Sequence, residues 1–259
     1  NSRLELVMQV VSVSSPVLSF LVLQFASLRI TLVLDALSFF LAFGLVVLLP
    51  KKEEKTMGEK KLTFRVIFSD IKEGVHYIVK QKEIFFLLVM ASSVNFFFAA
   101  FNYLLPFSNQ LYGIQGAYAT ILTMGAIGSI VGALLASKIK ASMEMLLFLL
   151  ALTGLGVMIM GFTLPSYLTF SGNFICELFM TIFNIHFFTQ VQTKVEGEYL
   201  GRVLSSIYSL AILFMPIATG LMTLLPSVHL YSFLIIGLGV VILSFLALSY
   251  VRTHFKKEI

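Results

Sequence analysis

Residues 84–137 read IFFLLVMASSVNFFFAAFNYLLPFSNQLYGIQGAYATILTMGAIGSIVGALLAS, and no residue in this stretch is charged. A helix rises about 1.5 Å per residue, so roughly 20 apolar residues cross about 30 Å of hydrocarbon. The stretch is therefore long enough for two membrane helices. The segment Pro106–Gly116 contains proline and glycine and predicts the turn between them.

Two other long runs repeat this pattern. Residues 145–193 carry one charge, Glu177, and residues 203–251 carry none. Each run is about twice the length of one span and therefore predicts a helical hairpin. The remaining predicted elements are the spans 6–28 and 30–49 and the turns 164–166 and 225–227. The sequence therefore predicts an all-α polytopic membrane protein with eight transmembrane helices.

The composition supports the same class. The chain is 58% hydrophobic and 12% charged, with a mean hydropathy of +0.97, whereas soluble domains are about 45–50% apolar and about 25% charged. The single cysteine, Cys176, excludes a disulfide framework or a cysteine-based metal site within the chain. No pair of histidines has the spacing of metal ligands, so no metal is expected.

Basic residues gather on one side of the predicted spans. Of the 18 Lys and Arg residues, only Arg29 falls on the opposite side, which leaves 17 together. Short loops rich in Lys and Arg stay in the cytoplasm, so both termini of this chain are expected inside. Lysine exceeds arginine and tryptophan is absent, a composition typical of an AT-rich bacterium. A bacterial cell membrane is therefore the expected location.

A charged segment, residues 51–83, separates the second predicted span from the third. Apolar residues recur at helical spacing from Leu62 to Ile78. They predict an amphipathic helix that lies either in the cytoplasmic interface or against cytoplasmic loops. The expected domains are 1–50, the last two helices of an N-terminal bundle; 51–83, a cytoplasmic linker with an amphipathic helix; and 84–259, a C-terminal six-helix bundle.

Four local motifs follow one another along the chain. In order they are Leu34-Asp35-Ala36-Leu37-Ser38-Phe39, Lys72-Glu73-Gly74-Val75-His76-Tyr77, the glycines Gly125, Gly128 and Gly132, and Glu198-Tyr199-Leu200-Gly201-Arg202-Val203. Together they resemble the drug:proton antiporter-3 branch of the major facilitator superfamily, which includes macrolide efflux proteins. The resemblance implies that the eight spans are helices five to twelve of twelve, with four helices before Asn1. It also implies two six-helix bundles around a substrate cavity, working by alternating access.

One stretch departs from the pattern of that superfamily. Its exporters carry Gly-Pro-x-x-Gly-Gly in helix five, and the matching residues here are Ser15-Pro16-Val17-Leu18-Ser19-Phe20. Pro16 is kept and is expected to have a packing or gating role. Glycines let helices approach closely, so their replacement predicts a looser contact. An uptake carrier or an inactive paralogue of the same fold is therefore an alternative to an exporter.

Glu177 is the most informative residue for function. It lies about ten residues into its span and so near the centre of the bilayer. A charge there costs at least about 2.5 kcal/mol, and intramembrane acids are for that reason commonly functional. At about 100° per residue, Asn173, Thr181 and Asn184 share its helix face. The stripe predicts proton coupling and substrate binding; the alternative is a structural hydrogen bond to a neighbouring helix.

A second polar stripe lies in the span that begins at residue 84. Ser92, Asn95 and Asn102 recur at helical spacing, and Phe98 stands among the phenylalanines beside them. Aromatic surface next to amide groups suits a large lipophilic solute, and a nearby acid favours a cationic one. These four residues are predicted to line the cavity. Alternatively the phenylalanines face lipid, since the chain contains 26 of them.

Small residues and one helix breaker are candidates for packing and gating. They are Gly125, Gly128 and Gly132 on one helix, Gly201 and Arg202 at a helix start, and Pro216 in the next-to-last span. The three glycines suit close packing and, in a rocking transporter, a sliding surface. The arginine is expected to anchor its helix at the interface or to form an interbundle salt bridge. The proline could kink its span, either as a gate or as a static bend.

No nucleotide-binding or hydrolase motif is present, which favours secondary transport and predicts no cofactor and no enzymatic activity. The leading interpretation is a monomeric transporter that exports lipophilic, macrolide-like solutes in exchange for protons. Its expected partners are the lipid bilayer, the solute and the proton, without nucleic acid. Alternatives from other classes are a permease served by a separate ATPase and a membrane-embedded enzyme. An enzyme would need clustered acids or histidines, which the sequence does not contain.

Overall fold

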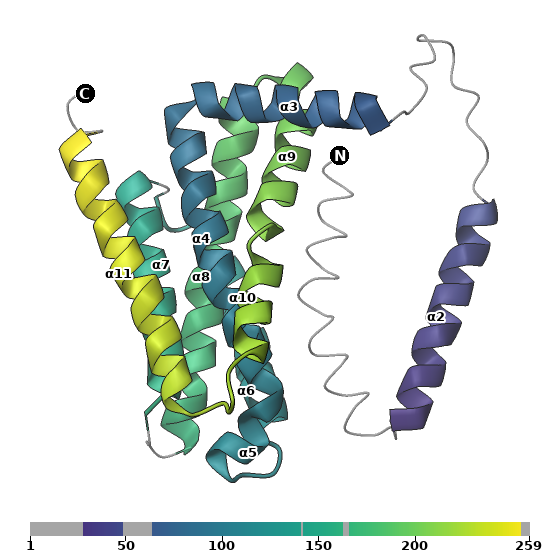
Figure 1. Ribbon diagram of the computed structural model, residues 1–259, viewed down its shortest axis with the longest axis vertical. Coiled ribbons are helices and arrows are strands. Elements are labelled where there is room, and N and C mark those ends of the chain that lie inside the picture. Colours follow the sequence, from purple (N-terminus) through teal and green to yellow (C-terminus); the bar gives the residue numbers. More distant parts are fainter. Residues whose placement is uncertain (1–27, 49–63, 141, 163–165, 255–259) are drawn as a thin grey trace. The chain divides into compact units, whose positions relative to one another are not determined.

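The computed structural model describes residues 28–48, 64–140, 142–162 and 166–254 (Figure 1). Within these residues every regular element is a helix, and none is a strand. The chain forms two compact units, Asn1–Ile67 and Phe68–Ile259. Each unit is described by itself below.

The first unit contributes one described membrane helix, α2 (Leu28–Leu48). It contains no proline and only two charged residues, Arg29 and Asp35, so lipid can surround it along most of its length. Its large apolar side chains are mostly exposed, as for Phe40 at 74%. This confirms the predicted span 30–49. Almost all of the predicted span 6–28, including Pro16, lies outside the described residues.

The second unit contains six hydrophobic segments in succession. They are α4 (Lys82–Leu104) continued by η1 (Leu105–Phe107) and α5 (Ser108–Tyr112), α6 (Ala117–Ala136), α7 (Met143–Met160), α8 (Ser166–Lys194), α9 (Gly197–Ile212) with α10 (Met215–Thr223), and α11 (Tyr231–His254). Together with α2, they give seven segments among the described residues that are long and apolar enough to cross a membrane. Seven of the eight predicted spans are thus confirmed as helices.

The turn predicted at Pro106–Gly116 is present. Pro106 lies at the start of η1, where its missing N–H costs no helical hydrogen bond. Gly113 and Gly116 have φ angles of +66° and +82°, a backbone region that glycine adopts without the steric cost of a Cβ atom. On the other side of the bundle, Ser142 caps α7 by accepting a hydrogen bond from the backbone N–H of Met145 at 3.2 Å.

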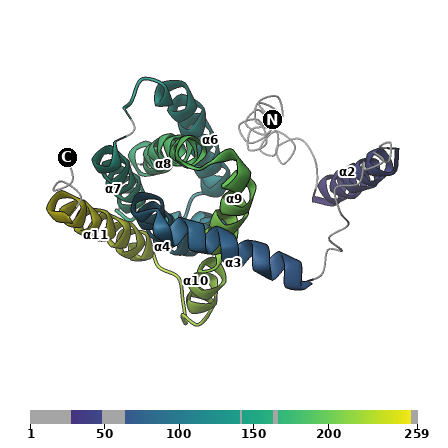
Figure 2. The same cartoon turned by 90° about the horizontal axis from the view of Figure 1, so that it is seen from above.

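The helices of the second unit pack as a bundle in which α8 is flanked by α6 and α7, and α4 by α11 and the α9–α10 segment (Figure 2). Helix α7 also packs on α11. Glycines bring these backbones together, since a Cβ added at Gly154 would lie 2.8 Å from the carbonyl oxygen of Gly237. A Cβ added at Gly156 would lie 2.7 Å from the carbonyl oxygen of Gly172. These glycine contacts hold α7 between its two neighbours.

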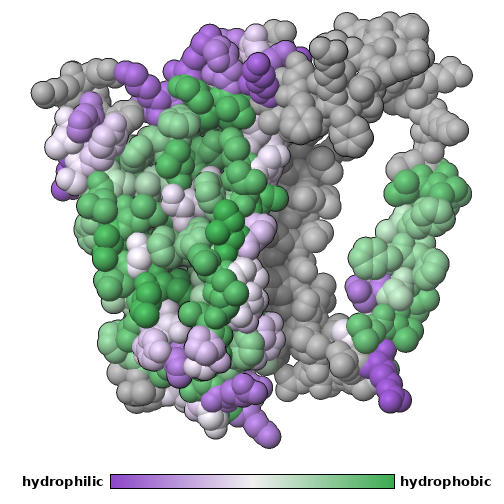
Figure 3. Space-filling model, in the orientation of Figure 1, coloured by the Kyte–Doolittle hydropathy of each residue, from purple (hydrophilic) through white to green (hydrophobic). Residues whose placement is uncertain are grey.

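The surface of the second unit is apolar between two polar ends. Figure 3 shows this band on one face, with hydrophilic residues above and below it. The band includes large exposed side chains such as Leu134 (71%) and Leu246 (65%). Exposed apolar patches of this extent mark a surface that meets another apolar phase. The chain is therefore a multi-pass membrane protein.

Candidate functional site

Glu177 lies on α8 against α6, inside the second unit. The hydroxyl of Ser129, on α6, donates a hydrogen bond to its Oε2 at 3.4 Å. Gly125, one helical turn before Ser129, makes room for this contact, since a Cβ there would lie 3.1 Å from Glu177 Cγ and would meet the amide of Asn173. The small residues of α6 therefore form the wall against which the Glu177 carboxyl group packs.

Asn173 lies one turn before Glu177 and is 3% exposed. Its Nδ2 donates a hydrogen bond to the carbonyl oxygen of Ile121 at 2.8 Å. Its Oδ1 is buried and accepts no hydrogen bond from any residue that the structure describes. An acceptor left in this condition costs about 1–3 kcal/mol, so it is a place where a donor would be bound favourably. Asn173 and Glu177 together offer two oxygen atoms on one face of α8.

The stripe continues toward the end of α8 and becomes more exposed. Thr181 is half-buried and Asn184 is exposed. One turn further on, the ring of Phe188 stacks on that of Tyr208 from α9, with the centroids 5.3 Å apart. The four predicted residues of α8 share one face at helical spacing, and Asn173 and Glu177 are the two whose hydrogen bonds join α8 to α6 in the described structure. Ser129 was not predicted; it lies on the same helix as the glycine ridge, one turn after Gly125.

The polar stripe of α4 contacts the junction between α9 and α10. The hydroxyl of Ser92 donates to the carbonyl oxygen of Leu210 at 3.4 Å, and Nδ2 of Asn95 donates to that of Ala211 at 3.0 Å. Pro216 is the second residue of α10 and has no N–H to bond the turn before it, so the helix is broken there. Ser92 and Asn95 thus bond carbonyl groups at the break.

The other two residues predicted to line a cavity lie apart from this junction. Phe98 is buried, at 8% exposure, and its ring makes an edge contact with that of Phe101 at 5.8 Å. Asn102 is exposed on the same helix. Whether any of the four α4 residues meets a solute stays a prediction.

The glycine ridge of α6 is in close contact with α8. A Cβ added at Gly128 would overlap the carbonyl oxygen of Phe174, and one added at Gly132 would overlap that of Leu178. Both overlaps involve backbone, which cannot rotate away as the end of a side chain can. The predicted packing role of these glycines therefore has a direct geometric basis.

Two of the four motifs meet each other in the structure. Helix α3 (Phe64–Lys80) carries the motif at residues 72–77, and the start of α9 carries the motif at residues 198–203. Arg202 Nη1 donates to Glu73 Oε2 at 2.9 Å. The rings of Tyr77 and Tyr199 stack with centroids 5.0 Å apart. This part of α3 therefore packs against the start of α9. Whether α3 lies in the cytoplasmic interface stays a prediction.

Glycine is required at the centre of this α3–α9 contact. A Cβ added at Gly74 would lie 2.6 Å from the carbonyl oxygen of Arg202 and would overlap the hydroxyl of Ser206. By contrast, a Cβ at Gly201 would meet nothing within 4 Å in the described structure. In the motif at residues 198–203, Arg202 therefore makes the contact with α3 and Gly201 does not.

Gly74→Val is expected to detach α3 from α9, because the larger side chain cannot fit against the Arg202 carbonyl. Ile78 is 1% exposed in the intact contact. In an Ile78→Cys background, labelling by a water-soluble maleimide should therefore rise several-fold when Gly74→Val is added. The native thiol, Cys176, is 0% exposed and should stay unlabelled. Gly201→Val is the matched control, and an equal labelling rate in both valine variants would contradict the contact.

Among the described residues, three ion pairs join elements at one end of the second unit, which we call the basic end. They are Arg202–Glu73, Lys194–Glu83 and Arg252–Glu144, from α9 to α3, from α8 to α4 and from α11 to α7. All six side chains are between 37% and 58% exposed. Exposed pairs contribute on the order of 0–1 kcal/mol each, so these pairs fix how the helix ends are arranged more than they stabilise the bundle.

The described residues contain no cluster of three or more His, Cys, Asp or Glu side chains that could hold a metal ion. His186 is buried on α8 and its Nε2 has no hydrogen-bond partner among the described residues. It lies about half a helical turn around from Glu177, at about 100° per residue. The two groups therefore do not form a common site.

Comparison with known proteins gives one match. The family model described as Major Facilitator Superfamily matches residues 1–211, about four fifths of the chain. The matched range contains all four motifs and the α6–α8 contact around Glu177. No curated protein and no solved structure matches the chain significantly.

Proposed function

The chain belongs to the major facilitator superfamily, and from this premise we propose that it exports lipophilic solutes across the cell membrane in exchange for protons. The proposal takes the eight spans as helices five to twelve of a twelve-helix transporter of the drug:proton antiporter-3 branch. The basic end faces the cytoplasm, as the positive-inside rule requires. The transporter acts as a monomer in a bacterial membrane and alternates access between two bundles.

One observation carries this proposal: the carboxyl group of Glu177 lies within a membrane span, hydrogen-bonded by Ser129 and without an ion-pair partner among the described residues. A permanent charge there is costly without a cation beside it. Binding of a proton neutralises the carboxylate and removes this cost. Release of the proton restores the charge. Glu177 is therefore the group to which we assign proton coupling.

The substrate class follows from what surrounds the acid. Asn173 offers an unpartnered oxygen atom one turn away, and Thr181 and Asn184 continue the polar face toward the basic end. Phe188 and Tyr208 give an aromatic stack beside this face. A solute with a large apolar body and a cationic or hydrogen-bond-donating group, such as a macrolide, would match both parts.

Transport by the full-length protein in proteoliposomes tests the proposal. A radiolabelled macrolide and a fluorescent cationic amphiphile are each offered with and without an imposed proton gradient. We expect movement of the solute against the proton flux, at a rate that falls to that of protein-free vesicles when a protonophore is added. Transport that follows the proton into the vesicles would identify an uptake carrier instead. No transport under any gradient would favour an inactive paralogue.

A further inference from the structure

Three oxygen-bearing side chains meet on one side of the α6–α8 contact. They are Ser129 of α6 and Asn173 and Glu177 of α8. Ser129 Oγ lies 3.4 Å from Glu177 Oε2. A Cβ added at Gly125 would meet Nδ2 of Asn173 and would lie 3.1 Å from Glu177 Cγ. The two side chains of α8 therefore border the same small space at this glycine, and Ser129 lies one helical turn further along α6.

The amide group of Asn173 is held in one orientation. Its Nδ2 donates to the carbonyl oxygen of Ile121, one turn before Gly125 on α6. Oδ1 occupies the other arm of the amide and has no hydrogen-bond partner among the described residues, although Asn173 is only 3% exposed. Side chains four residues apart on a helix have Cβ atoms about 5–6 Å apart. A single ion can therefore contact both Oδ1 and the carboxyl group of Glu177.

The site carries one negative charge when Glu177 is ionised. Helix α6 contains no acidic or basic residue, and α8 contains only two others that can carry charge, His186 and Lys194. His186 lies about half a helical turn around from Glu177. Lys194 ends α8 about 25 Å further along, at about 1.5 Å per residue, and pairs with Glu83. Neither helix therefore brings a cation to the carboxyl group.

Helices α7 and α9 also pack on α8, but their charged residues lie at the basic end. Glu144, in the first turn of α7, pairs with Arg252. Arg202 of α9 pairs with Glu73, and Glu198 lies one turn before Arg202, at the start of α9. In the part of the chain that the structure describes, the acid of α8 is thus left without a neutralising cation.

The three oxygen atoms suit a small monovalent cation. Carboxylate, amide carbonyl and hydroxyl oxygens are ligands of hard cations. One carboxylate neutralises one positive charge, so a monovalent ion leaves no net charge in the span, whereas a divalent ion leaves one. The backbone contact of α6 with α8 at Gly128 keeps the two helices close, which favours a small ion over a large one.

The site is open on one side. Asn173 is buried, whereas Ser129 and Glu177 are half-buried. An ion therefore reaches the carboxylate and the hydroxyl first and the unpartnered Oδ1 last. Binding there gives this oxygen atom a partner and removes the cost of leaving it unpaired.

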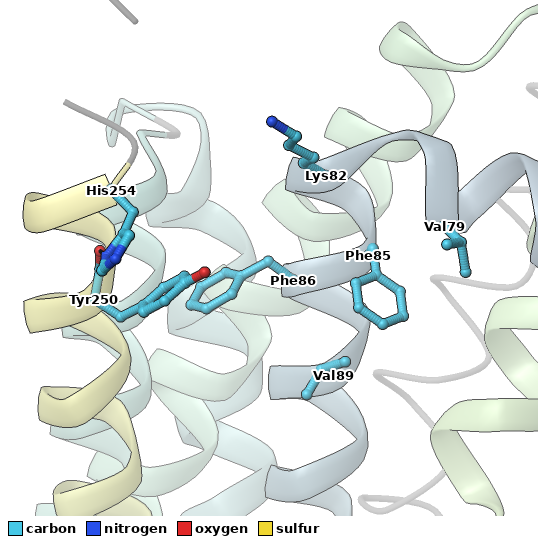
Figure 4. A pocket seen from close by; sticks show the side chains of 7 residues that line it. All are labelled: Val79, Lys82, Phe85, Phe86, Val89, Tyr250 and His254. Atoms are coloured by element: carbon cyan, nitrogen blue, oxygen red, sulfur yellow. Dashed lines mark hydrogen bonds between the residues drawn. The ribbon is translucent and has the colours of Figure 1, made fainter. Parts of the chain in front are cut away.

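The largest pocket shown in Figure 4 is not part of this site. It has a volume of about 540 Å³, and its lining residues come from α3, α4 and α11. Its wall includes the ring of Phe86, which stacks on that of Tyr250 with centroids 5.7 Å apart. Neither α6 nor α8 contributes to it, so an ion at Glu177 does not meet this pocket.

We propose that Ser129, Asn173 and Glu177 form a sodium-binding site. Its protein ligands are Ser129 Oγ, Asn173 Oδ1 and the carboxylate of Glu177, and water completes the coordination. The site goes beyond the proton exchange proposed above. Sodium and a proton neutralise the same carboxylate, and each therefore excludes the other.

Binding of radioactive sodium to the purified full-length protein in detergent tests this site. It is measured by scintillation proximity, without solute or gradient, with choline chloride keeping the ionic strength constant. We expect saturable binding that unlabelled sodium and lithium displace, that potassium displaces at least tenfold less well, and that choline does not displace.

Four variants assign the binding to these residues. Glu177→Gln should abolish it, since the carboxylate is lost. Asn173→Ala should weaken it about tenfold, the effect of one oxygen ligand to a charged group. Asn173→Asp keeps Oδ1 and adds a negative charge, so it should bind sodium at least as tightly as the unchanged protein, which loss of the Ile121 bond alone would not produce. Gln110→Ala, at an exposed amide on α5, is the control and should leave the affinity unchanged.

Three outcomes would overturn the assignment. Absence of displaceable binding in protein that is monodisperse by gel filtration would mean that the three oxygen atoms hold no sodium. Binding that survives both E177Q and N173A would place the ion elsewhere in the full-length protein. Equal displacement by potassium and sodium would mean that the site does not select a small ion. Because no solute or gradient is present, a failure of export in proteoliposomes would leave the sodium site standing.

Discussion

Replacing Glu177 by glutamine is expected to reduce gradient-driven export to the rate of protein-free vesicles. Glutamine keeps the length of the side chain, and its carbonyl oxygen can still accept the hydrogen bond from Ser129. What it lacks is a group that gains and loses a proton. Solute exchange between two sides at equal pH, which needs no net proton movement, should therefore continue in this variant.

The two assays together separate coupling from folding. Glu144→Gln is the matched control, because it makes the same chemical change at a carboxyl group that pairs with Arg252 at the basic end. It should keep both export and exchange. Ser129→Ala should retain export at a reduced rate, since it removes only one hydrogen bond. Full gradient-driven export by E177Q would show that Glu177 is structural and that the proton moves through another group.

Gly128→Val is expected to produce the largest loss of stability in the second unit. Its side chain would have to occupy the space of the Phe174 carbonyl oxygen on α8, so α6 and α8 would have to separate. Overpacking of this kind costs about 1–3 kcal/mol in well-packed interiors. We expect a lower midpoint of thermal unfolding in detergent and a smaller yield of monodisperse protein.

The control for this substitution is Gly220→Val on α10. It introduces the same side chain and the same loss of backbone freedom in a helix, but a Cβ at Gly220 meets nothing within 4 Å in the described structure. Its unfolding midpoint should therefore remain close to that of the unchanged protein. If both valine variants unfold at the same temperature, close packing of α6 on α8 at Gly128 does not contribute to the stability of the second unit.

The spans could be predicted from the sequence because lipid sets a simple rule. A charge-free run must reach across the hydrocarbon, and only a helix satisfies its backbone there. The turn at Gly113 and Gly116 was predicted for an equally local reason. Helical spacing also placed Asn173 and Glu177 on one face of α8.

The partners of these faces could not be predicted, because spacing gives the direction of a side chain but not the neighbour that it meets. Ser92 and Asn95 were predicted as part of a polar stripe, but their hydrogen-bond partners, carbonyl groups more than a hundred residues later in the chain, could not be named. Likewise, the motifs containing Glu73 and Arg202 were recognised separately. Their contact joins residues 129 positions apart.

The glycines of α7 were missed for a related reason. Gly154 and Gly156 stand two residues apart and point to different helices, α11 and α8. Neither belongs to a run of small residues four apart, which is the pattern that predicts a packing ridge. Only the positions of both neighbouring helices show why each must be small.

The junction between α9 and α10 bears on how this protein is made. The two helices have 16 and 9 residues, which at about 1.5 Å each measure about 24 Å and about 14 Å, so neither crosses about 30 Å of hydrocarbon alone. Together they form one candidate span of 25 residues, Tyr199–Thr223, and Ser92 and Asn95 donate to two carbonyl groups at the junction. Because α4 precedes α9 along the chain, the ribosome releases these donors first. We therefore expect them to be in the bilayer when the broken segment arrives; the Leu210 carbonyl also accepts the backbone N–H of Leu213, so the donor that matters most there is Asn95, which bonds Ala211.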